Sequence, residues 1–217
     1  MSVAIAVPLL SSTAFIDMRY RLSSLKRLLD YLKPCIESVV ERPEEVESVA
    51  MRIVEDQRAL ILFVAATIEV LRLPRSEMVR AFEELRKFVE DLRARGIDVR
   101  EAIEILLEHD LWKLRWLATD FDRYIGMWFE FVSRYEDEAR RYVLLYLSCF
   151  LLMLALYEVS DEKKLRRIAE IVKKYADELE SYLATFVLAM ESPQPEDLEV
   201  VGKARTPDEL RKVLDLE

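Results

Sequence analysis

The sequence YVLLYLSCFLLMLALY at residues 142–157 carries no charge over 16 positions and is bounded by Arg141 and Glu158. As a helix it spans about 24 Å, which is shorter than the membrane hydrocarbon core of about 30 Å. A helix that is apolar on every side is otherwise buried in protein. We therefore expect this segment to be the central helix of a water-soluble bundle, without integral membrane insertion. An interfacial or short membrane-spanning segment is the alternative for this run, and peripheral membrane attachment through the apolar segments is an alternative for the whole protein.

The segment after this run has the pattern of a long amphipathic helix capped by Ser160. Its apolar residues alternate at spacings of three and four, which is typical of a heptad seam. The seam consists of Leu165, Ile168, Val172, Tyr175, Leu179, Tyr182, Phe186 and Ala189.

Helical spacing continues through the N-terminal half of the chain. Apolar periodicity predicts helices over 17–40, 43–73, 75–95 and 98–107, and an aromatic-rich helix from about 111 to 134 that could run on into residues 142–157. Pro34 predicts a kink or a break in the first of these. Gly96 is placed to end the third, and Asp98 with Glu101 to open the fourth.

Composition supports the same fold class. Only 3 glycines occur in 217 residues, which is too few for the tight turns of a sheet protein. We predict an all-α, single-domain bundle of about six main helices over residues 1–191. A linker over 192–205 and a short C-terminal helix over 206–217 follow, the helix beginning with Thr206, Pro207 and Glu209 as cap, first-turn proline and third-position acid.

The composition points to a thermophile, and we expect the protein to be cytoplasmic. The chain has no asparagine, two glutamines and 22 arginines among its 32 basic residues, a composition that ion-pair networks favour at high temperature. High genomic GC content is the rival explanation for the arginine excess. The net charge of −9 disfavours a general nucleic-acid binder.

Two cysteines, Cys35 and Cys149, lack any metal-binding spacing. Intracellular disulfides occur in hyperthermophiles, so a Cys35–Cys149 bridge is one hypothesis, and two free thiols is the other.

The aromatic-rich helix holds every tryptophan of the chain. Such a stripe either packs in the core or anchors a partner helix or an apolar ligand, because aromatic and arginine side chains are frequent interface anchors. The interaction candidates are Trp112, Trp116, Tyr124, Trp128, Arg115 and Arg123.

A basic patch lies opposite the heptad seam. It is either a solvated, ion-paired face or a contact for nucleic acid or an acidic partner. Its residues are Lys163, Lys164, Arg166, Arg167, Lys173 and Lys174.

Catalytic chemistry has weaker support. The single histidine, His109, excludes schemes that need two imidazoles, and no phosphate-binding glycine loop is present. A carboxylate-held Mg²⁺ site would need paired acids on facing helices, for which the weak candidates are Glu101, Glu104, Asp120 and Asp122.

Glu69 is the one acid inside the apolar run LILFVAATIEVLRL. A buried carboxylate needs a partner, and Arg72 three residues later is the expected one.

Taken together, these patterns favour a helical interaction or scaffold protein, either a homo-oligomer or a small helical subunit of a larger assembly, with no cofactor. The alternatives are a Mg²⁺-dependent nucleotide or polyphosphate hydrolase and a nucleic-acid-associated subunit that uses the basic patch. Protein partners or self-association are expected in the first case, and nucleic acid in the last.

Overall fold

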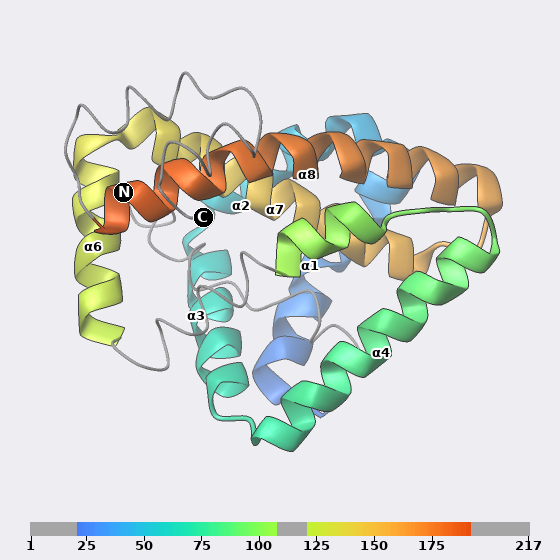
Figure 1. The fold of residues 1–217 in the computed structure, drawn as a ribbon, viewed down its shortest axis with the longest axis horizontal. Coiled ribbons are helices and arrows are strands. Elements are labelled where there is room, and N and C mark those ends of the chain that lie inside the picture. The colour runs from blue at the N-terminus through green and yellow to red at the C-terminus, as the bar shows by residue number, and fades with distance from the viewer. Residues whose placement is uncertain (1–20, 108–120, 192–217) are drawn as a thin grey trace, which may run out of the picture.

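Helices form the whole framework of residues 21–107 and 121–191, the part of the chain that the structure describes, and no strand occurs there (Figure 1). In this computed structural model they are α1 (Ser23–Glu41), the 3-10 turn η3 (Pro43–Glu45), α2 (Val46–Glu55), α3 (Gln57–Leu71), α4 (Arg75–Ala94), α6 (Phe121–Arg134), α7 (Glu136–Glu158) and α8 (Glu162–Glu191). Residues 100–107 form a further helical segment. The predicted all-α bundle is confirmed. The linker and terminal helix predicted over 192–217 lie outside the described residues.

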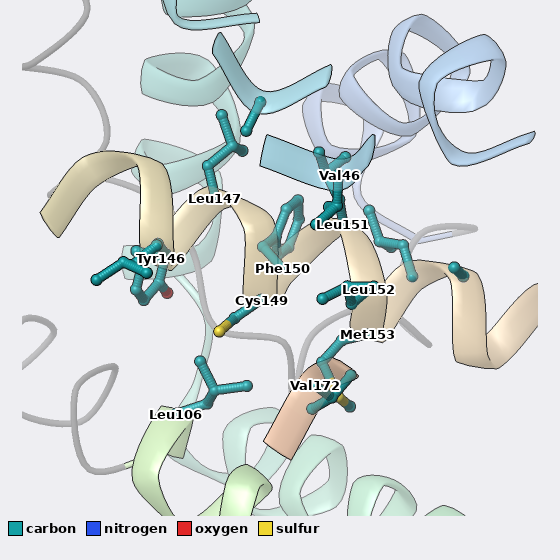
Figure 2. Close-up of a cluster of buried hydrophobic side chains, with 14 of the residues drawn as sticks. Val46, Leu106, Tyr146, Leu147, Cys149, Phe150, Leu151, Leu152, Met153 and Val172 are labelled. Atoms are coloured by element: carbon teal, nitrogen blue, oxygen red, sulfur yellow. The ribbon is translucent and has the colours of Figure 1, made fainter. Parts of the chain in front are cut away.

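The uncharged run forms most of α7, around which four other helices pack. Helices α1, α2, α6 and α8 contact it, and every residue from 142 to 156 is buried. Figure 2 shows Leu151 beside Val46 of α2, and Cys149 pointing toward Leu106 of the segment 100–107. The core of the described residues is therefore one cluster centred on α7.

Among the described residues, α7 is the helix whose length and composition would allow it to cross a membrane. However, 89% of its apolar window is buried inside the bundle. A fully buried leucine contributes about 1.5–3 kcal/mol relative to an exposed one. Packing against neighbouring helices is thus sufficient reason for the apolar composition of α7.

Ser148 is the polar exception within α7. Its side chain is 0% exposed, and its Oγ atom has no hydrogen-bond partner in the part of the chain that the structure describes. A buried hydroxyl without a partner loses its hydration and gains nothing in return. We expect Ser148→Ala to raise the free energy of unfolding by about 1 kcal/mol. Urea denaturation followed by circular dichroism would measure the change, and a loss of stability would show that the hydroxyl has a partner.

One predicted boundary in the first half of the chain is wrong. The single helix predicted over 43–73 is broken at Asp56, whose carboxylate accepts a hydrogen bond of 2.8 Å from the backbone N–H of Arg58 and so caps α3. Aspartate favours such caps because its short side chain satisfies an orphan N–H. Pro34 lies inside α1 without breaking it into two helices, so of the two outcomes predicted there the break does not occur and the kink stays a prediction.

In the second half of the chain, the structure differs from the sequence-based expectation at two helix boundaries. Helix α6 ends at Arg134 and α7 begins at Glu136, so the two apolar segments are not one continuous helix. Helix α8 is capped by Asp161, which accepts a 2.9 Å hydrogen bond from the N–H of Lys164, and not by Ser160 as predicted. The heptad seam is confirmed from Leu165 to Tyr182, where all six positions are buried or half-buried.

Arg141 connects three helices at the polar end of the core. Its guanidinium donates to Glu178 of α8 at 2.6 and 2.9 Å and to Glu47 of α2. The Tyr175 hydroxyl also donates to Glu47, at 3.3 Å. Burial and the nearby Glu47 carboxylate raise the pKa of Tyr175 to about 12, so the phenol stays a donor. This network fixes how α2, α7 and α8 lie against one another.

The two thiols do not form the disulfide that was one hypothesis. Both are free: Cys35 is half-buried on α1, and Cys149 is 0% exposed on α7. Burial raises the pKa of both thiols, so neither favours the reactive thiolate.

Candidate functional site

The outward side of α3 exposes large apolar side chains. Ile61 is 68% exposed and Ile68 is 42% exposed, and half-buried Val64 and Ala65 lie between them on the same helical stripe. We call these four residues the α3 face. No charged residue occurs between Arg58 and Glu69, so α3 is apolar on its outward side as well as its inward side.

The inward side of α3 explains why the helix is held firmly. Ala59, Phe63, Ala66 and Val70 are buried, and the ring of Phe63 meets that of Phe150 on α7 edge-on, with 6.2 Å between centroids. The outward residues are thereby presented on a packed element and not on a loop. A rigid apolar surface of this kind is typical of a binding site.

The N-terminal end of α3 is fixed by Asp56. The Tyr31 hydroxyl of α1 donates to its carboxylate, which also caps α3. The hydrogen bond from Tyr31 and that from Arg58 lower the pKa of Asp56, and burial together with Asp56 raises the pKa of Tyr31 to about 12. Both groups therefore keep the protonation states that the hydrogen bond needs at neutral pH.

The C-terminal end of α3 is fixed by Glu69, whose partner is not Arg72 as predicted. Its carboxylate accepts hydrogen bonds from the N–H groups of Ser23 at 3.0 Å, Ser24 at 2.7 Å and Leu25 at 3.3 Å, and from the Ser23 hydroxyl at 3.1 Å. These are the orphan donors at the start of α1, which has no cap of its own. A carboxylate there is also favoured by the helix dipole.

A groove lies between α4 and the segment 100–107. Its volume is about 480 Å³, and we call it the α4 groove. Leu85 and Ile103 are buried at its base, and Phe82, Val89 and Leu107 are half-buried beside them. Charged residues complete the lining: Arg86, Glu90, Arg93, Arg100 and Glu104.

Only some of the aromatic and arginine candidates lie within the described residues. Trp112, Arg115 and Trp116 lie outside the described residues, as do the side chains of Arg123 and Tyr124. Trp128 is 0% exposed, and its ring lies 5.5 Å from Phe131 and 6.0 Å from Tyr142 between centroids. Trp128 is therefore a core residue. Its neighbour Phe129 is 43% exposed.

The basic patch is largely engaged by the protein itself. Lys164 pairs with Glu41 at 2.5 Å, and Arg167 pairs with Glu44. Arg166 donates to the backbone carbonyls of Arg95 and Gly96, each at 3.0 Å, just beyond the end of α4. Gly96 has the positive φ of 71° expected after a helix end. Lys163, Lys173 and Lys174 are exposed on the same helix.

The acidic candidates do not assemble into a metal site in the described part of the chain. No group of three or more His, Cys, Asp or Glu side chains there could hold a metal ion. Glu101, Glu104 and Asp122 are exposed, and Asp120, like His109, lies outside the described residues. Asp98 instead serves as the predicted cap, accepting a 3.1 Å hydrogen bond from the N–H of Arg100.

No family model matches the chain, and neither a curated protein nor a solved structure matches it. The α3 face and the α4 groove are surfaces that sequence reasoning missed. The uncharged run of α3 was a signal for the first, but the sequence did not indicate which side would be left open.

Proposed function

We propose that this protein is a helical interaction protein that self-associates through the α3 face. The observation that carries the proposal is the exposure of Ile61 and Ile68 on a helix that carries no charge between Arg58 and Glu69. Helices of that composition are normally buried all round, as α7 is here. A second copy of the chain would complete the burial of α3.

The α3 face suits an antiparallel, two-fold contact. With Ala65 near the axis, Ile61 of one copy packs against Ile68 of the other, and the reverse contact forms by symmetry. The small side chain of Ala65 lets the two helices approach closely. Antiparallel packing also brings exposed Glu55, the last residue of α2, toward exposed Arg72, which follows α3 in the other copy. In this antiparallel arrangement the dipoles of the two α3 helices point in opposite directions, which is the favourable orientation.

A charge on the α3 face should separate the copies. We expect Ile61→Asp to weaken self-association at least about 100-fold, because the two-fold contact would bury two unpaired carboxylates. Size-exclusion chromatography coupled to light scattering, over a dilution series, would measure the change in dissociation constant. Circular dichroism should show the helical content unchanged, since residue 61 is exposed in the single chain.

Phe129→Asp provides the matched control. Phe129 is also an exposed apolar residue, but it lies on α6. We expect this variant to associate like the wild type. If Phe129→Asp separates the copies and Ile61→Asp does not, the contact lies at the aromatic-rich segment and the proposed role of the α3 face is wrong.

A further inference from the structure

The α4 groove has the features of a site for a short amphipathic helix. Its apolar base is bordered by charged side chains on both α4 and the segment 100–107. Along α4 the apolar residues from Phe82 to Val89 lie within eight positions, or about 10 Å of helix. This is the length that two turns of a docked helix would cover.

The C-terminal residues of the chain have a matching pattern. Residues 206–217 read TPDELRKVLDLE, in which Leu210, Val213 and Leu214 fall at i, i+3 and i+4. This spacing places them on one side of a helix, while Arg211 and Lys212 fall on the other. We infer that residues 206–217 dock as a helix in the α4 groove of their own chain.

Charge complementarity supports this occupant. Three arginines and two glutamates line the groove, and Arg86 and Glu90 already pair with each other at 3.3 Å. This pairing leaves two arginines in the lining, Arg93 and Arg100, and one glutamate, Glu104. The C-terminal segment carries four acids, Asp208, Glu209, Asp215 and Glu217, against two bases, so it brings excess negative charge to excess positive charge.

The linker is long enough to reach the groove. Helix α8 has 30 residues and is about 45 Å long. Its first turn lies near the end of α4, because Glu162 and Arg95 are 4.0 Å apart. The 14 residues from 192 to 205 span up to about 46–50 Å, enough to return along the full length of α8. Tethering gives the segment a high effective concentration at the groove.

Docking in this way would block the groove in the free protein. A partner helix with the same apolar spacing and acidic flanks could then bind only by displacing the segment. This inference concerns a surface separate from the α3 face, so either proposal can fail without the other.

Disulfide trapping in the full chain tests the docking. The variant carries Glu104→Cys on the groove and Leu214→Cys on the segment, in a Cys35→Ser background, with buried Cys149 retained. Glu104 is exposed, so its replacement leaves the core intact. We expect an intramolecular 104–214 disulfide, located by peptide mass mapping, to form at least about ten times faster than in the control.

The control pair is Val79→Cys with Leu214→Cys. Val79 is 49% exposed on the same helix but is not part of the groove. Adding Arg93→Glu and Arg100→Glu to the test pair should slow trapping toward the control rate. Equal rates for the two pairs, or a 104–214 bond that forms only between chains, would overturn the inference.

Discussion

Trp128→Ala should destabilise the protein by about 3–5 kcal/mol, the usual result of truncating a large buried aromatic residue. Trp128 is 0% exposed and packs against Phe131 of its own helix and Tyr142 of α7. Its removal therefore leaves a cavity where α6 meets the central helix. Because the surrounding helices are held by many other contacts, only part of this cavity can collapse.

Urea denaturation would measure the Trp128→Ala effect, with Phe129→Ala as the matched control. The two residues are neighbours of similar chemistry, but Phe129 is 43% exposed and should change the stability by less than about 1 kcal/mol. A small effect at Trp128 with a large one at Phe129 would mean that α6 presents its opposite side to the core.

Glu69→Gln should lower the free energy of unfolding by about 2 kcal/mol at neutral pH. The carboxylate accepts four hydrogen bonds from the start of α1, whereas a glutamine side chain has one acceptor oxygen and turns an NH₂ group toward donors. The control is Glu90→Gln, which alters an exposed ion pair and should cost less than about 0.5 kcal/mol.

The Glu69 effect should also depend on pH. Burial raises the pKa of this carboxyl, but the hydrogen bonds from Ser24, Leu25 and Ser23 outweigh burial, so its pKa lies below the ordinary 4.5. A lowered pKa in the folded state gives stability that is complete above the unfolded pKa and is lost as the pH falls through the folded pKa. The difference between wild type and Glu69→Gln should therefore narrow below about pH 4.5. A difference that is absent at pH 7, or constant down to pH 3, would contradict the cap.

The fold followed from periodicity and composition because these are local properties of a helical chain. The uncharged run of α7 and the seam of α8 identified the two central helices, and Gly96 identified a helix end. Boundaries that depend on a single cap were less predictable. Asp56 interrupts an apolar pattern that continues on both sides, and the pattern alone does not distinguish a cap from an exposed helical position.

The surfaces were harder to predict because they depend on which helices become neighbours. The sequence assigned Glu69 to nearby Arg72, whereas its partners come from residues 44 to 46 positions away. Likewise, Trp128 and Phe129 are adjacent in a single aromatic segment, but only the first is buried. The α4 groove combines residues of two separate helices, so no local pattern indicated it.

The molar mass of the wild-type protein in solution tests the central claim most directly. Light scattering during size-exclusion chromatography, at micromolar concentration and neutral pH, should give twice the mass of one chain. Dilution should return the mass toward that of one chain. A protein that keeps the mass of a single chain up to high concentration would contradict self-association through the α3 face.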